Sequence, residues 1–154
     1  MDCAVATMGD IPRIVALLLR IEKGTRPKWA VGKESPYPAI VPRDVKISLR
    51  NIMAQDAGIC FTTLNAMIAG VVAPSRINFS VLESYELFWQ SNGRDGNKVL
   101  RAYEDWSLSM GAKRIILTSM HSLDENDASE LRRKLFNRRG YKLSESVWEK
   151  RINV

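Results

Sequence analysis

Hydrophobic and polar residues recur at two different spacings along the chain, and the spacings separate predicted helices from predicted strands. Residues 11–21 place apolar side chains three and four positions apart, as on one face of a helix. The same spacing predicts helices over residues 43–55 and 96–110, and Gly111 ends the second of these helices. A last helix starts near residues 125–128. The pattern therefore predicts four helices.

Short apolar runs between these helices predict the strands of one sheet. They cover residues 2–6, 58–64, 66–74, 81–89, 114–119 and 144–152. Short connections join the three runs in the middle, so we expect antiparallel neighbours there. The order β-α-α-β-β-β-α-β-α-β predicts an α+β (mixed α/β) fold in one domain over residues 1–154. Its sheet is antiparallel first and parallel near its middle.

The most distinctive segment is the polar turn before the helix at residues 96–110. It reads SNGRDGNK and contains Gly93, Gly96 and Lys98. Such a turn suits a phosphate, because a helix N-terminus has unpaired N–H groups and partial positive charge. Gly96 has no Cβ, so the backbone can approach the phosphate closely. A P-loop is excluded, because no Ser or Thr follows the lysine.

Composition limits the class of protein without giving a function. The 154 residues are 45% apolar and 26% charged, as in ordinary globular proteins. No apolar run reaches the ~18 residues of a membrane span, and the N-terminus lacks the layout of a secretory signal. Cys3 and Cys60 lie in strand-like runs. We interpret them as reduced core residues of a cytoplasmic protein, with a disulfide as the other reading.

The net charge of +6 allows an anionic ligand or partner but does not identify it. One dense basic cluster consists of Arg132, Arg133, Lys134, Arg138 and Arg139. No interleaved aromatic residues and no recognisable nucleic-acid module accompany it, so a solvated helix face and nucleic-acid binding both stay open. His121 is the only histidine and the two cysteines are far apart, so we expect no metal site.

Three longer segments fit together as one set of motifs. "ATMGDIPRIVALL" provides the first strand and helix, and "ESYELFWQSNGRDGNKVLRAYEDWSLSMGAKRIIL" provides strand, turn, helix and strand. "ELRRKLFNRRGYKLSES" contains an aromatic residue followed by Gly-Tyr. Over almost the whole chain, this order resembles the GNAT superfamily of acetyl-CoA-dependent N-acetyltransferases. The resemblance implies a sheet of about six or seven strands with helices on both faces.

The resemblance also implies an activity, the transfer of an acetyl group from acetyl-CoA to a primary amine by direct attack. The amine would belong to a small molecule or a protein, and relatives are commonly homodimers. The coenzyme-binding positions would be Phe88, Trp89, Gln90, Arg94, Asp95, Gly96, Asn97, Lys98, Val99, Asn126 and Ser129. A strand N–H near Phe88 would polarise the thioester carbonyl. Trp29, Tyr37 and Tyr85 would line the acceptor pocket.

Such a reaction needs a base, because an ammonium group cannot attack a thioester until it loses a proton. Glu83 and Glu86 lie on the strand before the turn, where the family frequently carries its base. Three residues apart on a strand, they point to opposite faces, so only one can face the cleft. Glu83 matches the family better by position. Both could also be ordinary glutamates of a sheet surface.

Three positions depart from the family's pattern. Gly93 stands where the family has Gln or Arg, and Lys98 where it has a second small residue, while Arg94 offers a replacement cation. Phe136 stands where many members have the tyrosine that protonates the departing thiolate. These departures favour an alternative function, a non-catalytic GNAT-fold binding or regulatory protein. A basic nucleic-acid-binding protein is the third reading.

Overall fold

The structure, a computed structural model, describes residues 2–25, 40–93, 95–118 and 134–142, without the side chains of residues 22–25. Contacts divide the chain into two units, Met1–Thr118 and Ser119–Val154. In the second unit, residues 134–138 form a short helix that a turn at Gly140 follows. Gly140 has a φ of +82°, a conformation that glycine adopts readily, as expected at the end of a helix.

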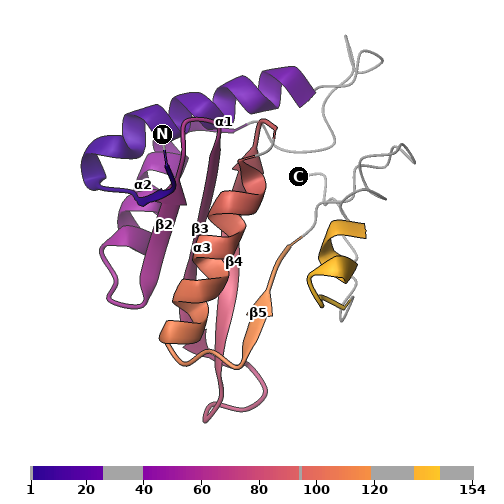
Figure 1. Ribbon diagram of the computed structural model, residues 1–154. Helices are drawn as coiled ribbons and strands as arrows, with labels where there is room; N and C mark the ends of the chain where they lie inside the picture. The colour runs from indigo at the N-terminus through magenta and orange to yellow at the C-terminus, as the bar shows by residue number, and fades with distance from the viewer. Residues whose placement is uncertain (1, 26–39, 94, 119–133, 143–154) are drawn as a thin grey trace, which may run out of the picture. The chain divides into compact units, whose positions relative to one another are not determined.

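The first unit contains the following elements (Figure 1): β1 (Ala4–Val5), η1 (Met8–Asp10), α1 (Ile11–Thr25), α2 (Pro42–Met53), β2 (Gly58–Thr62), β3 (Ala66–Pro74), β4 (Leu82–Ser91), α3 (Gly96–Ser109) and β5 (Arg114–Ile116). Their order is the predicted one up to β5. The five strands form one sheet in the order β1-β2-β3-β4-β5. Neighbours from β1 to β4 are antiparallel, whereas β4 and β5 are parallel. The predicted mixed sheet is therefore confirmed.

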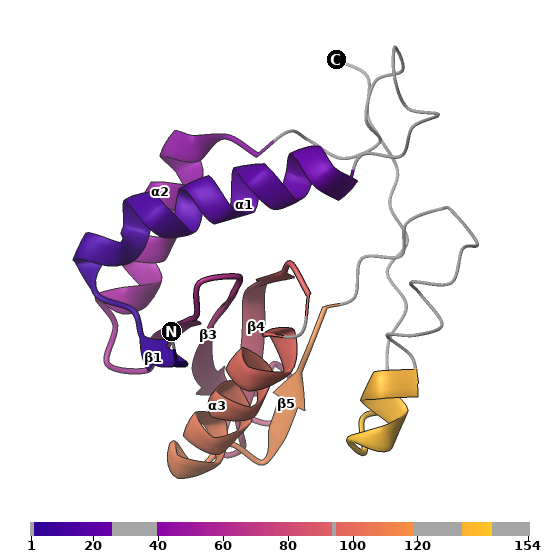
Figure 2. The same ribbon diagram turned by 45° about the horizontal axis from the view of Figure 1, so that its top comes forward.

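Helices cover both faces of this sheet. Figure 2 shows α1 and α2 on one side of the strands and α3 on the other. Met67 and Ala69 of β3 pack with the buried side chains of α1 and α2, whereas Ala66 and Ile68 pack with those of α3. Successive side chains of a strand point to opposite faces, so β3 contributes to two hydrophobic clusters. We call them the α1/α2 cluster and the α3 cluster.

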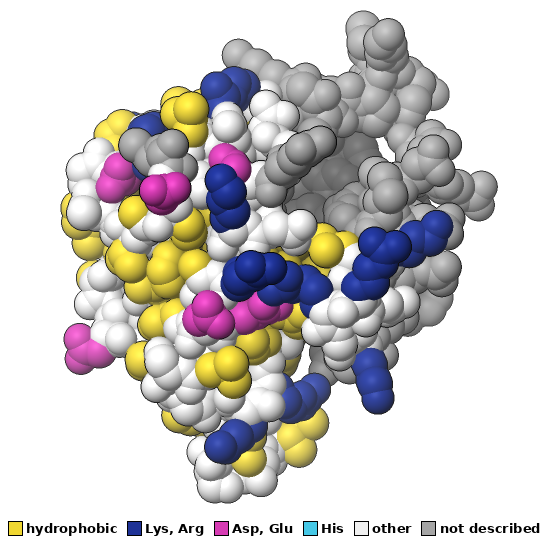
Figure 3. Space-filling view, viewed as in Figure 1, with side chains coloured by type: hydrophobic (Ala, Val, Ile, Leu, Met, Phe, Trp, Pro, Cys, Tyr) yellow, Lys and Arg dark blue, Asp and Glu magenta, His cyan; other side chains and the backbone are white. Residues whose placement is uncertain are grey.

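The inner side of α3 carries a small polar network among its apolar residues. The Ser84 hydroxyl of β4 donates to the Tyr103 hydroxyl at 2.8 Å, and the Ser107 hydroxyl lies 2.7 Å from Ser84 Oγ. All three side chains are fully buried. A Cβ at Gly70 would overlap the Tyr103 hydroxyl, so β3 needs a glycine where the tyrosine crosses it. The opposite, exposed side of α3 carries charges of both signs (Figure 3).

Several element boundaries differ from the prediction by a few residues, and three of them illustrate the reason. The helix α1 continues to Thr25, beyond Ile21, the last periodic apolar position. The helix α2 starts at Pro42, where the missing N–H of proline costs nothing. The strand β5 ends at Ile116, and the Thr118 N–H then donates to the Glu86 carboxylate. Apolar periodicity does not report such ends, which depend on capping and on tertiary contacts.

Some predicted elements lie outside the described residues. These are the start of the last helix at residues 125–128 and the last strand at residues 144–152. Within the described parts of the chain, no helix is both long enough and apolar enough to cross a membrane.

Candidate functional site

The centre of the candidate site is an irregularity in β4. Gly70 of β3 pairs with Glu86 and Ala69 pairs with Phe88, so Leu87 has no partner on β3. This is a β-bulge, which bends a strand and increases its twist. On its other side, β4 pairs with β5 only over residues 83–85. In the described structure, β4 and β5 therefore part at the bulge.

Glu86 lies at the point where the two strands part. Its carboxylate Oε2 accepts the backbone N–H of Thr118 at 2.9 Å, and the residue is 7% exposed. Burial disfavours the charged form and raises the pKa of Glu86 to about 7, although the hydrogen bond from Thr118 opposes this shift. No cation of the described chain forms an ion pair with Glu86. This carboxyl group can therefore take up and release a proton near neutral pH.

Glu83 has a different environment on the opposite face of β4. Its Oε1 pairs with Nη1 of Arg114 at 2.7 Å, and its Oε2 accepts the Tyr85 hydroxyl at 2.6 Å. The hydrogen bond from Tyr85, with further ones from Ser75 and Arg114, holds the pKa of Glu83 below its usual value. The carboxylate thus ties β5 and the end of β3 to β4. A group so fully engaged is a poor proton acceptor.

The polar turn before α3 is organised around two glycines and an ion pair. Gly93 has a φ of +98°, which explains a glycine at a position where the family has Gln or Arg. A Cβ at Gly96 would lie 2.9 Å from Ser91 Oγ and 3.0 Å from Ser91 Cβ. Close packing inside the turn therefore requires this glycine. Lys98 Nζ lies 3.3 Å from Asp95 Oδ1, so the turn's lysine is partly neutralised.

The other predicted coenzyme-binding positions on β4 and α3 fall on different sides of the sheet. Phe88 packs against the α1/α2 cluster and Trp89 against the α3 cluster. Gln90 and Asn97 are exposed, and Asn97 is in the first turn of α3. The Val99 side chain is fully buried in the α3 cluster, so only its backbone is available to a ligand. The turn and the bulge thus lie at the two ends of the half of β4 that pairs with β3 but, among the described residues, has no strand on its β5 side.

Several predicted site residues lie outside the described residues. These are Trp29, Tyr37, Arg94, Asn126 and Ser129. Phe136 is described, and its ring packs on that of Tyr141 with centroids 5.6 Å apart. The contact gives Phe136 a packing role within the second unit. Of the basic cluster, Lys134 and Arg138 are exposed, and residues 132–133 are not described.

Sequence reasoning missed the partners of the two glutamates. Glu83 faces Arg114 because β4 and β5 pair in one particular parallel register. Glu86 reaches Thr118 because β5 stops two residues earlier. The alternation of the strand did predict that the two carboxylates point to opposite faces. No spacing in the sequence reports the register of a strand pair that a helix separates.

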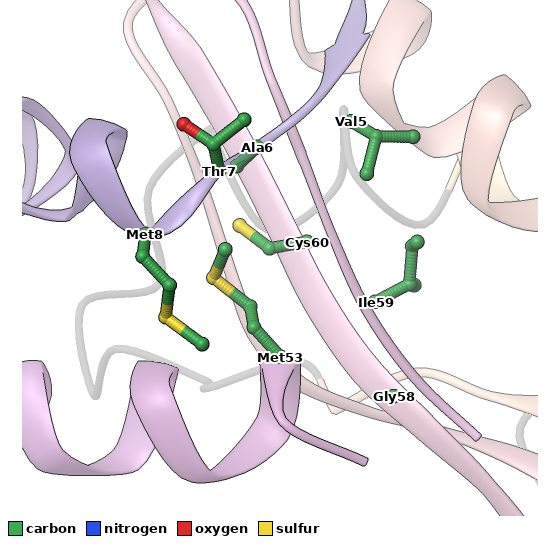
Figure 4. A pocket seen from close by; sticks show the side chains of 8 residues that line it. All are labelled: Val5, Ala6, Thr7, Met8, Met53, Gly58, Ile59 and Cys60. Carbon is green, nitrogen blue, oxygen red and sulfur yellow. The ribbon is translucent and has the colours of Figure 1, made fainter. Parts of the chain in front are cut away.

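A pocket of about 240 Å³ lies at the other edge of the sheet, between β1, β2 and the end of α2 (Figure 4). Met8, Met53 and Cys60 line it with their sulfur-bearing side chains. Burial raises the pKa of the Cys60 thiol to about 12, so it stays protonated and unreactive. Cys3 and Cys60 are both free thiols. Within the described residues, no group of three or more His, Cys, Asp and Glu side chains could hold a metal ion.

Comparisons of the whole chain with known proteins find matches in fold but not in sequence. No protein-family model matches the sequence, and no curated protein matches it. Solved structures do match. A predicted acetyltransferase from Clostridium acetobutylicum, solved with acetyl-CoA, superposes with a TM-score of 0.66 at 14% identity, covering 97% of this chain and 95% of that one.

Two further structures match as closely. Glucosamine-6-phosphate N-acetyltransferase from Arabidopsis thaliana has a TM-score of 0.65 at 12% identity, over 99% of this chain and 98% of that one. A transcriptional regulator from Bacillus halodurans C-125 has a TM-score of 0.67 at 15% identity, over 98% and 99%. The chain has the GNAT fold. At these identities the likeness extends to the fold alone, and the chemistry of this chain has to be argued from its own residues.

Proposed function

We propose that the protein is an N-acetyltransferase that moves an acetyl group from acetyl-CoA to a primary amine. The observation that carries this proposal is Glu86, a buried carboxyl group with a pKa of about 7 at the point where β4 and β5 part. An acid with this pKa is suited to proton transfer at neutral pH.

Two features suit an extended ligand that ends in a phosphate. They are the open β5 side of β4 beyond the bulge and the first turn of α3. Among the described residues, no strand pairs with the β5 side of β4 beyond residue 85. Backbone groups near Phe88 and Gln90 would hold the chain of the coenzyme, and the α3 N-terminus with Asn97 and Lys98 would hold its pyrophosphate. When bound, acetyl-CoA supplies a thioester that an amine can attack.

Glu86 would act as the base of this reaction. The amine nitrogen forms a bond to the acetyl carbon, the carbon–sulfur bond breaks, and the electron pair leaves with the sulfur of coenzyme A. The nitrogen gives up its proton to the Glu86 carboxylate, directly or through a water molecule. The Thr118 N–H holds the carboxylate in position. We assign the role to Glu86 and not to Glu83 because Arg114 and Tyr85 occupy the oxygens of Glu83.

The substitution Asn97→Glu tests where the coenzyme binds. A carboxylate in the first turn of α3 interacts favourably with the helix dipole, so the melting temperature of the variant should stay the same or rise. The same charge opposes a pyrophosphate, so the Kd for acetyl-CoA should rise about tenfold or more at low salt. Isothermal titration calorimetry measures the affinity. Asn51→Glu, an identical change on the exposed side of α2, is the matched control.

Two results would contradict the proposal in different ways. An unchanged affinity of Asn97→Glu for acetyl-CoA would show that the coenzyme does not bind at the turn. No binding of acetyl-CoA to the unsubstituted protein at millimolar concentration would remove the enzyme reading itself. A non-catalytic binding protein would then be favoured. The pairing of Lys98 with Asp95 in the turn and the missing hydroxyl of Phe136 support that second candidate.

A further inference from the structure

A second pocket lies on the face of the sheet opposite α3, at the end of β3 and the middle of β4. It has a volume of about 280 Å³ and is lined by Val71, Ala73, Pro74, Arg76, Tyr85 and Leu87. Val71, one of its walls, packs against the α1/α2 cluster. The pocket therefore begins where the cover of α1 and α2 ends. We call it the Arg76 pocket.

The walls of the Arg76 pocket are apolar, and the ring of Tyr85 forms one of them. The Tyr85 ring is held in place because its hydroxyl donates to Glu83 at 2.6 Å. A backbone hydrogen bond from Arg76 reaches the same hydroxyl. A fixed aromatic ring beside three aliphatic side chains and a proline suits an apolar body, such as a methylene chain.

One charge at this pocket is left without a counterion. The Arg76 guanidinium carbon lies 5.9 Å from the centroid of the Tyr85 ring, at the distance of a cation–π contact. No described carboxylate forms an ion pair with Arg76, and the negative charge of Glu83 is matched by Arg114. A guanidinium presents its donors as a planar fork that matches a carboxylate or a phosphate. The pocket therefore favours an anionic group at Arg76.

The opposite end of the Arg76 pocket lies at the bulge, where β4 and β5 part, on the face of β4 opposite to the one that carries the Glu86 side chain. Leu87 is both a wall of the pocket and the bulged residue, next to Glu86 in the chain. Tyr85 and Leu87 are two residues apart on β4, which corresponds to about 7 Å along a strand. An amine at the bulge and an anion at Arg76 would thus be separated by a spacer of several atoms.

We propose that the acceptor is a primary amine joined to an anionic group by an apolar spacer, with Arg76 binding the anion. This inference rests on the proposed acetyltransferase function, because it names the acceptor class of that same site. Amines with a carboxylate directly beside the nitrogen are too short to reach both ends. Long-chain ω-amino acids and peptides with an N-terminal amine and a nearby acidic side chain have the required layout.

The experiment compares 6-aminohexanoate with hexylamine, which share the amine and the spacer and differ in the carboxylate. Coenzyme A release measures acetyl transfer, and chemical shift changes of the protein measure binding of each amine in the absence of acetyl-CoA. We expect a kcat/KM at least tenfold higher for 6-aminohexanoate, mostly through KM. Arg76→Glu should remove this advantage and Arg76→Lys should keep part of it. Arg43→Glu, at the exposed first turn of α2, is the control for the change in charge.

The two readouts separate this inference from the proposed function. If 6-aminohexanoate binds the protein and Arg76→Glu abolishes the binding, the pocket assignment stands even in the absence of transfer. Equal binding or equal kcat/KM for the two amines overturns it, whether or not acetyl-CoA binds. An undiminished preference for 6-aminohexanoate in Arg76→Glu also overturns it, since the carboxylate would then be bound elsewhere. Glycine as the best acceptor would contradict the required spacer.

Discussion

Glu83 and Glu86 are identical in chemistry, three residues apart on one strand, and shifted in opposite directions. The hydrogen bond from Tyr85 and the Arg114 guanidinium lower the pKa of Glu83, whereas burial raises the pKa of Glu86 to about 7. The difference arises from which face of β4 each side chain occupies and from what covers that face. Two such carboxyl groups can divide structural and acid–base roles between them.

Glu86→Gln should lower kcat/KM for acetyl transfer by a factor of about 10² to 10⁴, the usual effect of losing a general base. In the unsubstituted protein the rate should rise with pH through about 7, as Glu86 loses its proton, and this rise should be absent in the variant. Steady-state kinetics between pH 5.5 and pH 9 measures both effects. Glu83→Gln is the contrast. It should lower the melting temperature through loss of the Arg114 pair, and it should keep the pH profile.

The same substitution at Glu86 should make the protein more stable at alkaline pH. The pKa of Glu86 is about 7 in the folded state against 4.5 for an ordinary glutamate, so the folded state loses stability as pH rises through 7. A shift of this size corresponds to about 3 kcal/mol, and burying the glutamine amide reduces the gain to about 1–3 kcal/mol. Urea unfolding at pH 8 and at pH 4.5 measures it. A gain that is equal at both pH values would contradict the assigned pKa.

At the scale of single residues, the sequence predicted which side chains the site contains better than it predicted which residues they contact. It placed a glutamate, a glycine turn and a strand with alternating faces in the right order. It favoured Glu83 by position, whereas the geometry favours Glu86, because the ion pair with Arg114 depends on a parallel register. The bulge at Leu87 could not be predicted from the sequence either, because a bulge is a property of two paired strands and not of one.

At the scale of elements, α3 crosses β3 in close contact. Gly70 lies beneath Tyr103, and a Cβ there would overlap both the Tyr103 hydroxyl and the Tyr85 carbonyl oxygen. The hydroxyl belongs to a side chain that can move, whereas the carbonyl belongs to the backbone of β4. The Tyr103 hydroxyl can therefore move away from a new Cβ more easily than the Tyr85 carbonyl oxygen can.

Gly70→Ala should lower the free energy of unfolding by about 1–3 kcal/mol, because overpacking displaces α3 or β4. Adding Tyr103→Phe should recover only part of this loss, since the carbonyl of Tyr85 still blocks the new methyl group. Chemical denaturation of the single and double variants measures the coupling. Gly9→Ala is the control, because a Cβ there meets nothing closer than 3.6 Å. Full recovery in the double variant would place the conflict in the side chain alone.

The order of elements was predictable because helical and strand spacings are local properties of the chain. The β2–β3–β4 meander follows from short connections, and β3 has the predicted bounds, Ala66–Pro74. The ends of α1 and β5 were not predictable in the same way. The helix α1 continues past its apolar stripe to Thr25, and β5 ends early beside Glu86.

At the scale of the whole molecule, ligand binding and folding are linked. If acetyl-CoA binds only the folded state, a concentration of one hundred times its Kd should stabilise the protein by about 2.7 kcal/mol. For a chain of this length that corresponds to a rise in melting temperature of about 5–10 °C. A thermal unfolding series with acetyl-CoA measures the rise, and Asn97→Glu should require a higher concentration for the same shift. A melting temperature that is independent of acetyl-CoA would favour the non-catalytic reading.

The bulge at Leu87 also has a genetic consequence. Because Glu86 pairs with Gly70 and Phe88 with Ala69, an in-frame deletion of the single Leu87 codon would leave a regular ladder between β3 and β4. Phe88 and Trp89 would keep their present faces, so both hydrophobic clusters would survive. A lineage could thus lose the parting of β4 and β5 in one mutational step and keep the fold. In this protein, the parting of β4 and β5 can therefore change while the fold is kept.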